Sequence, residues 1–223
     1  MKKTVLFTLM TISFISQVHA KALFGRVDKY LDVKNQSVIE IGSNEISDDG
    51  KTAEYFDYRD SKRKTIDMND VSKSTREEIA GVKAGEAVLV TTLVANSKTE
   101  TVSRYCEVFY VFENKEAYVG CKSTNADYIP GYQLPERFDF IINNVENVIA
   151  EVASLDGFSK GDTAELNIDT ENAKKGRSIR ILAIFANGEA LIQKTGFSQL
   201  DTSGLVYKRG VDRVQLSDLI NPK

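Results

Sequence analysis

The sequence predicts a mainly β protein built from repeated small units. Residues 103–121 and 176–194 align at an offset of 73 and share apolar and aromatic positions on both sides of an asparagine. Upstream, residues 80–90 and 156–166 align at an offset of 76 and share two glycines. Runs of β-branched and aromatic residues bounded by turn residues are typical of strands. The aligned stretches therefore indicate copies of one β-rich unit.

Residues 1–20 have the pattern of a secretory signal peptide. Lys2 and Lys3 precede an apolar run, and Val18 and Ala20 form a cleavage site of the A-x-A type. The apolar run is shorter than the ~20 residues of a membrane-spanning helix, although an uncleaved anchor is the alternative. We expect cleavage between Ala20 and Lys21, a periplasmic or secreted protein, and no membrane span.

The composition excludes several chemistries from the chain that follows the predicted signal. The only histidine is His19, within the signal, and the sequence has no tryptophan. Since histidine is the usual general base near neutral pH and a common metal ligand, His-dependent triads and His–zinc sites are excluded. The net charge of −3 becomes more negative when Lys2 and Lys3 leave, so nucleic acid is an unlikely partner. We expect no catalytic residues, no metal and no cofactor.

The N-terminal unit is expected over residues 21–72. A hairpin over 25–41 should turn at Asn35 and Gln36, and we interpret it as this unit's counterpart of the two aligned hairpins. Residues 63–72 resemble 212–220 and should form the closing strand. The glycine-flanked entry segment of the other copies is missing here, which indicates a partial repeat.

The middle unit is expected over residues 73–140, with a short helix at 72–80 and a closing strand at 131–138. Its hairpin, 103–121, should turn at Asn114 and Lys115. A two-residue turn places Val108 opposite Cys121 and makes Cys106 a diagonal neighbour on the same face.

The two cysteines, Cys106 and Cys121, are predicted to form a disulfide, because an even pair in an exported chain favours a bridge. The bridge would close a loop of about 15 residues and add ~3 kcal/mol in the chain-entropy model. If the units fold independently, reduction should weaken the middle unit and leave the last one folded.

A linker helix is predicted over 136–155. Apolar residues recur there at intervals of three and four, and Pro135 suits the first helical turn. The C-terminal unit follows over 156–223, with a hairpin that turns at Asn187 and Gly188. Asn-Gly between apolar runs is a strong hairpin signal because both residues tolerate positive φ.

Three features define a unit of about 60–75 residues: an entry segment of the form GxxxG[ED] in the middle and C-terminal units, a long hairpin, and a closing strand of the form h-x-h-[SN]-D-h in the N- and C-terminal units. This combination resembles the SH3-like small β-barrels, including bacterial SH3-type and Tudor-like modules. The resemblance implies tandem barrels joined by short helices. The alternative is a single β-sandwich, which also has regularly spaced strands, but a helix between units fits tandem barrels better.

Two motifs are interpreted as turns. GFSKG, residues 157–161, matches the nucleophile pattern G-x-S-x-G at Ser159, but that chemistry needs a histidine. NEISDDG, residues 44–50, resembles the start of a calcium loop, but Phe56 occupies the position that requires glutamate.

Basic residues cluster in three segments, two of which precede closing strands. They are candidates for an edge that binds phosphate, a lipid headgroup or an acidic glycan, or else they are solvated loops. Tyr55, Phe56 and Tyr58 flank the first cluster and suit either sugar or base stacking or a barrel core. The basic candidates are Arg59, Lys62, Arg63, Lys64, Lys174, Lys175, Arg177, Lys208, Arg209 and Arg213.

Three functions are compatible with these features. The first is a non-enzymatic binding or scaffold module for an envelope glycan or an envelope protein, which follows partly from the fold resemblance. The second is an inhibitor or accessory subunit of an envelope hydrolase. The third is a hydrolase that uses carboxylates, since glycosidases need no histidine.

Overall fold

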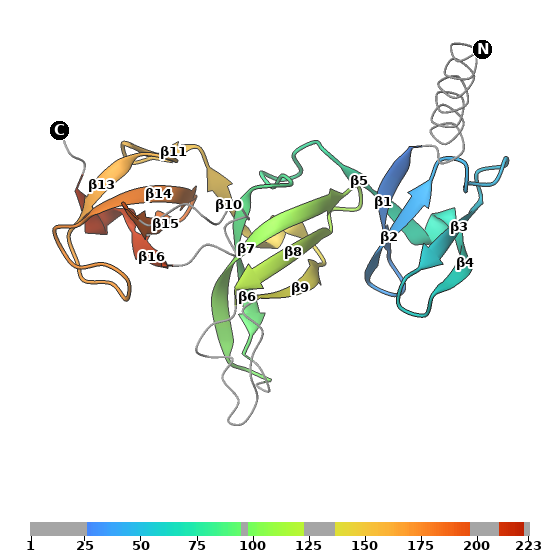
Figure 1. Cartoon of the computed structure of the whole chain (residues 1–223), viewed down its shortest axis with the longest axis horizontal. Coiled ribbons are helices and arrows are strands. Elements are labelled where there is room, and N and C mark those ends of the chain that lie inside the picture. Colours follow the sequence, from blue (N-terminus) through green and yellow to red (C-terminus); the bar gives the residue numbers. More distant parts are fainter. Residues whose placement is uncertain (1–25, 95–97, 123–136, 197–209, 221–223) are drawn as a thin grey trace, which may run out of the picture. The chain divides into compact units, whose positions relative to one another are not determined.

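The structure is an antiparallel β protein, which confirms the predicted fold class at that level (Figure 1). The computed structural model describes residues 26–94, 98–122, 137–196 and 210–220. The predicted signal peptide with its cleavage site lies outside the described residues, as do Lys208 and Arg209. In the described part of the chain, no helix has the length and apolar composition needed to cross a membrane.

The chain divides into two compact units. Unit 1 takes its described residues from 26–74 and 112–114, and unit 2 takes them from 75–111 and 115–220. In unit 1, β1 pairs with both β2 and β5, while β3 pairs with β4. The elements are β1 (Val27–Asp32), β2 (Ser37–Gly42), β3 (Thr52–Asp57), β4 (Lys62–Asp67), the 3-10 turn η1 (Met68–Asp70) and β5 (Val71–Thr75).

The predicted first hairpin is confirmed as β1 and β2. Gln36 adopts φ 47° in the turn, and the buried Asp32 carboxylate accepts the amides of Lys34 and Asn35 at 3.1 and 3.0 Å. Its place in the repeat differs from our interpretation, because β1 and β2 correspond to the first two strands of the other repeats. The core of unit 1 lies between this hairpin and the β3–β4 hairpin: Tyr30, Ile39, Ile41, Ala53, Tyr55 and Ile66.

Unit 2 contains two successive groups of strands with the same order. In each group the closing strand pairs with the first strand, β10 with β6 and β17 with β13. The first group is β6 (Ala87–Leu93), β7 (Thr101–Phe112), β8 (Ala117–Lys122), β9 (Arg137–Ile142), η3 (Val145–Asn147) and β10 (Ile149–Val152). The second is β13 (Thr163–Leu166), β14 (Ser178–Phe185), β15 (Glu189–Lys194), β16 (Val211–Gln215), η5 (Leu216–Asp218) and β17 (Leu219–Ile220), preceded by the hairpin β11 (Ser154–Leu155) and β12 (Phe158–Ser159).

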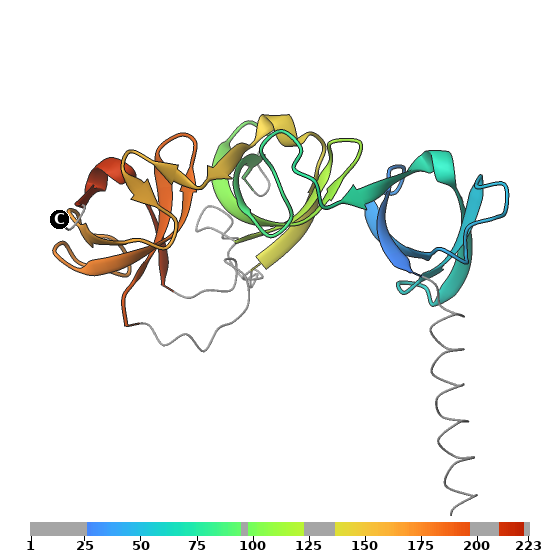
Figure 2. The ribbon, with the colours of Figure 1, turned by 90° about the horizontal axis from the view of Figure 1, so that it is seen from above.

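Aligned positions of the two groups have the same backbone geometry. The amide of Gly85 donates to Val108 at 2.8 Å, and the aligned amide of Gly161 donates to Ile181 at 2.9 Å. Both glycines have positive φ, 89° and 95°, where an L side chain would be strained. Each group also places a 3-10 turn before its closing strand, as unit 1 does, and Figure 2 shows these turns as short helical ribbons.

The two aligned hairpins are confirmed, but the predicted register of the first is wrong. Cys106 pairs directly with Cys121, and Val108 pairs with Val119. The difference arises because the turn takes more than two residues and a bulge at Phe109 shifts the register further. The second hairpin has its bulge at the aligned position, Leu182.

The linker helix predicted over 136–155 is wrong. Residues 137–142 form β9, η3 follows, and β10 begins at Ile149. Asn144 interrupts the apolar run, and its side chain accepts the amide of Glu146 at 2.9 Å to start the 3-10 turn. Two short strands on either side of such a turn produce the same spacing of three and four. The middle unit ends in β9 and β10. Of the closing strand predicted at 131–138, residues 137–138 belong to β9, and 131–136 lie outside the described residues.

The short helix predicted at 72–80 is also wrong. Here β5 continues to Thr75, and Ile79 and Val82 exchange two backbone hydrogen bonds around a turn at Ala80 and Gly81. Both turn residues have positive φ, which a helix does not allow.

The two strand groups of unit 2 share a strand and an apolar cluster. Residues of β10 pair with β6 of the first group and with β14 of the second, so a strand replaces the expected helical connection. Around this strand a third cluster forms between the separate cores of the two groups. Its buried members are Ala87, Leu89, Leu182, Ala183, Phe185, Leu191 and Val211.

Candidate ligand groove

A groove of about 630 Å³ lies on the outer face of the β3–β4 hairpin in unit 1. One side is formed by the strands, and the other by the loop between β2 and β3. Its lining combines apolar, hydroxyl, amide and charged groups: Val27, Glu40, Asn44, Glu45, Ile46, Ser47, Thr52, Ala53, Glu54, Phe56, Tyr58, Arg63 and Thr65. Its volume is within the range of ~300–1,000 Å³ that is usual for small-ligand sites.

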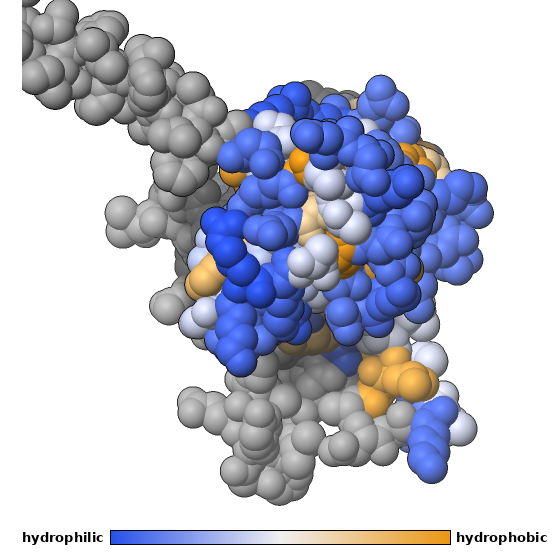
Figure 3. Space-filling model, turned by 90° about the vertical axis from the view of Figure 1, so that its right-hand side faces the viewer, coloured by the Kyte–Doolittle hydropathy of each residue, from blue (hydrophilic) through white to orange (hydrophobic). Residues whose placement is uncertain are grey.

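Strand alternation explains the aromatic part of the lining. In β3, Ala53 and Tyr55 are buried, whereas Glu54 and Phe56 point outward. The rings of Phe56 and Tyr58 meet edge to face, with centroids 5.1 Å apart. Phe56 is 42% exposed and Tyr58 75%. Tyr55 is thus the core residue, while Phe56 and Tyr58 form an exposed pair. Figure 3 shows less hydrophilic atoms in the middle of the otherwise hydrophilic face of unit 1.

Hydrogen bonds fix the loop on the opposite side. Ser47 Oγ accepts the amide of Thr52 at 3.0 Å and is within 2.8 Å of Asp49 Oδ1. The Glu45 carboxylate accepts the amide of Gly42 at 2.8 Å. The segment 44–50 is an acidic turn, as interpreted. In the part of the chain that the structure describes, no group of three or more acidic, histidine or cysteine side chains is placed to hold a metal ion.

The acidic residues of the groove are paired with bases. Arg63 lies 3.4 Å from Glu54 and 3.8 Å from Glu45, and Lys29 forms an ion pair with Glu40 across β1 and β2. The three carboxylates share two bases, so these side chains present both donors and acceptors and leave one negative charge in excess.

A second hollow, of about 240 Å³, adjoins the aromatic pair and shares Glu40, Phe56 and Tyr58 with the groove. Asp57 closes it, at 2.7 Å from Lys64 and 3.7 Å from Arg59. The hydrogen bond from Lys64, followed by that from the Arg59 amide, lowers the pKa of Asp57 below its usual value. Hydrogen bonds to Asp57 and then Asp60 raise the pKa of Lys64.

The predicted basic candidates occupy separate places. Arg59, Lys62, Arg63 and Lys64 lie together on the β3–β4 hairpin of unit 1. In unit 2, Lys174, Lys175 and Arg177 lie in the loop between β13 and β14, where Lys174 pairs with Asp169 at 2.9 Å. Arg213 lies on β16 and pairs with Glu189 at 3.2 Å. Anion binding by these residues stays a prediction, and local carboxylates already neutralise Arg59, Arg63, Lys64, Lys174 and Arg213.

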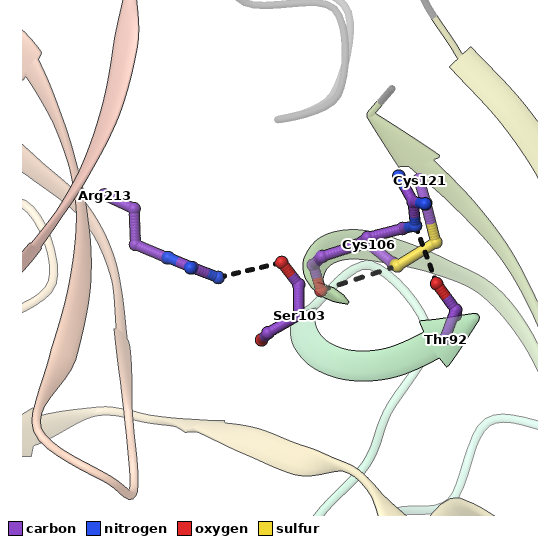
Figure 4. The surroundings of a disulfide bond; sticks show 6 residues. Thr92, Ser103, Cys106, Cys121 and Arg213 are labelled. Atoms are coloured by element: carbon purple, nitrogen blue, oxygen red, sulfur yellow. Dashed lines mark hydrogen bonds between the residues drawn. A yellow bond between two sulfur atoms is a disulfide. The ribbon is translucent and has the colours of Figure 1, made fainter. Parts of the chain in front are cut away.

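The predicted disulfide between Cys106 and Cys121 is confirmed (Figure 4). Both cysteines are fully buried in the core of the first strand group of unit 2. Beside them, Arg104 donates to the Thr92 hydroxyl at 2.7 Å. Arg213, from the second group, donates to the Ser103 carbonyl at 3.0 Å. The bridge therefore lies next to a polar contact between the two groups.

Two other features bear on catalysis. Ser159 belongs to β12, and its amide donates to Asp162 at 2.8 Å, so GFSKG comprises β12 and the turn that precedes β13. A carboxylate pair lies where the strand groups of unit 2 meet. The nearly buried Glu151 accepts the Ala87 amide at 2.8 Å and lies 2.6 Å from Lys160. Burial, and then the charge of Glu151, raise the pKa of Glu86.

Sequence reasoning missed the groove, although it noticed the aromatics. The available signal was the alternation of Glu54, Phe56 and Tyr58, which indicates one solvent-facing side of a strand once that strand is recognised. Comparison with models of known protein families and with curated proteins found no match for this chain.

Proposed function

We propose that this protein is an exported, non-enzymatic binding module that recognises a component of the cell envelope through the groove of unit 1. The signal-like N-terminus and the disulfide support export, because disulfides persist in oxidising compartments. The groove carries the binding part of the proposal, since it combines an exposed aromatic pair with polar groups along the β3–β4 hairpin.

The repeats are best interpreted as SH3-like modules. Three features support this interpretation: the common strand order, the 3-10 turn before each closing strand, and the pairing of the closing strand with the first. Phe56 and Tyr58 do not belong to the hydrophobic core of unit 1, which is formed by other residues. Packing of the core therefore does not explain why these two aromatic residues are present. A binding role accounts for their exposure.

The test is retention of envelope components by the purified exported chain. Immobilised protein is incubated with isolated envelopes, and retained material is compared for the wild type, Phe56→Ala with Tyr58→Ala, and the control Val33→Ala. Val33 is also an exposed apolar residue of unit 1, 39% exposed, but it does not line the groove. We expect retention by the wild type and the control and loss in the double variant. Retention that is equal in all three proteins would refute the groove as the binding site.

A further inference from the structure

We propose that the ligand of the unit 1 groove is a glycan chain without net charge, whose sugar rings stack on Tyr58 and Phe56. The inference rests on the proposed function and narrows it from an envelope component to one chemical class. It follows from the ring arrangement, the polar lining, the ion pairs and the residues that the two hollows share.

The aromatic pair is a prepared stacking surface. The rings of Phe56 and Tyr58 meet edge to face with centroids 5.1 Å apart, and such contacts are favourable beyond the area that they bury. Tyr58 nevertheless leaves 75% of its surface exposed. Aromatic residues give a large, rigid contact area at a low cost in conformational entropy. A flat ligand face, such as the C–H face of a pyranose ring, can therefore bind without reorganising the site.

The polar lining matches hydroxyl groups. A sugar hydroxyl both donates and accepts, so it needs acceptors and donors within one site. Carboxylate oxygens of Glu54 and Glu40 supply acceptors, and the Arg63 guanidinium supplies donors. The Thr65 hydroxyl, directly opposite Glu54 in the strand register, can do both.

The existing ion pairs of the lining favour a neutral ligand over a basic peptide. A basic peptide would have to compete with Arg63 for Glu45 and Glu54, and with Lys29 for Glu40. An acidic polymer would meet the same three carboxylates without a surplus of bases in the lining. A neutral ligand leaves these ion pairs in place and uses their outward-facing atoms.

The two hollows favour a chain of sugars over a single one. Both are lined by the aromatic pair, and they share Phe56, Tyr58 and Glu40. A ligand that contacts both rings therefore has the larger groove and the smaller hollow within its reach. Affinity should accordingly rise with the length of the oligosaccharide until both are filled.

The experiment uses envelope material separated into three probes. Protease digestion and anion exchange give a neutral glycan fraction and a charged glycan fraction, and solubilised envelope proteins form the third. Binding of the exported chain to each probe is measured at 50 and 500 mM salt. The proteins compared are the wild type, Tyr58→Ala, and Val33→Ala as the control, each verified as folded by circular dichroism.

We expect the wild type and Val33→Ala to bind the neutral glycan, with less than about a twofold change between the two salt concentrations, since no charge pairs are screened. Tyr58→Ala should bind about tenfold more weakly, in line with the loss of one stacked ring. Tyr58-dependent binding of the charged glycan or the protein fraction alone would overturn the neutral-glycan inference and leave the proposed function intact. Equal binding by the wild type and Tyr58→Ala would overturn the groove as the binding site. Binding to none of the probes would overturn both the proposed function and the neutral-glycan inference.

Discussion

Reduction of the Cys106–Cys121 disulfide should destabilise both strand groups of unit 2 together. The sequence suggested that only the middle repeat would weaken. In the structure, however, β10 pairs with strands of both groups, and a buried cluster is shared between them. A destabilised first group therefore removes the packing surface of Leu182 and Phe185 in the second.

The expected magnitude follows from the closed loop. The cysteines are 15 residues apart, for which the chain-entropy model gives about 3 kcal/mol of stabilisation. With a denaturant dependence of ~4 kcal/mol per molar guanidinium chloride for a unit of this size, the unfolding midpoint should fall by about 0.7 M. Reduction changes only the sulfur–sulfur bond, so it avoids the packing changes that a substitution at these buried positions would add.

The assay is equilibrium unfolding with and without a phosphine reductant, followed by pulsed hydrogen exchange and mass spectrometry. Peptides from β7 and β14 report the two groups, and peptides from β2 serve as the control, since unit 1 contains neither cysteine. We expect β7 and β14 to share one lowered midpoint while β2 is unchanged. A lowered midpoint for β7 with an unchanged one for β14 would show that the shared cluster does not couple the groups.

Three other substitutions test separate features of unit 2. Phe185→Ala, in the shared cluster, should cost about 4 kcal/mol in a denaturant titration; a loss below 1 kcal/mol would contradict tight packing there. Asp212→Ala removes the acceptor of the Thr170 hydroxyl at 2.7 Å and should cost about 2 kcal/mol, with faster amide exchange in the loop 167–177. Glu86→Gln should stabilise the unit at pH 7, because burial and the neighbouring Glu151 disfavour the ionised form. The raised pKa means that this penalty is present above the folded-state pKa and absent below the usual pKa of 4.5, so the gain should vanish near pH 4. An equal gain at both pH values would refute it.

Local chemistry made the hairpins and the disulfide predictable. Asn35, Asn114 and Asn187 mark turns within a few residues of sequence, and positive φ at Gln36 and Lys115 follows from those turns. The register was not predictable in the same way. The bulge at Phe109 changes which residues of β7 and β8 lie opposite each other. The register depends on packing on the two faces of the sheet, which the local sequence does not reveal.

The wrong prediction of a helix over 136–155 and the failure to predict the groove have a common cause. Apolar spacing of three and four describes a helical stripe, but it also arises when β9 and β10 flank a 3-10 turn, and only the pairing of β9 with β8 distinguishes the two. Likewise, residues that line the groove come from positions 27 to 65 and meet through strand pairing. Such long-range pairing cannot be deduced from the periodicity of a single segment.

The double pairing of β10 restricts how this chain can change in evolution. Ile149 and Ala150 close one repeat, and the next two residues of the same strand pair with the following repeat. Recombination between the two groups of unit 2 would therefore break one of these pairings. Replacing either group with another module would leave part of β10 without its strand partner and would expose the remaining residues of the shared apolar cluster. Duplication or loss should therefore involve the pair as a whole, whereas sequence drift is expected to be freest in loops that neither group buries.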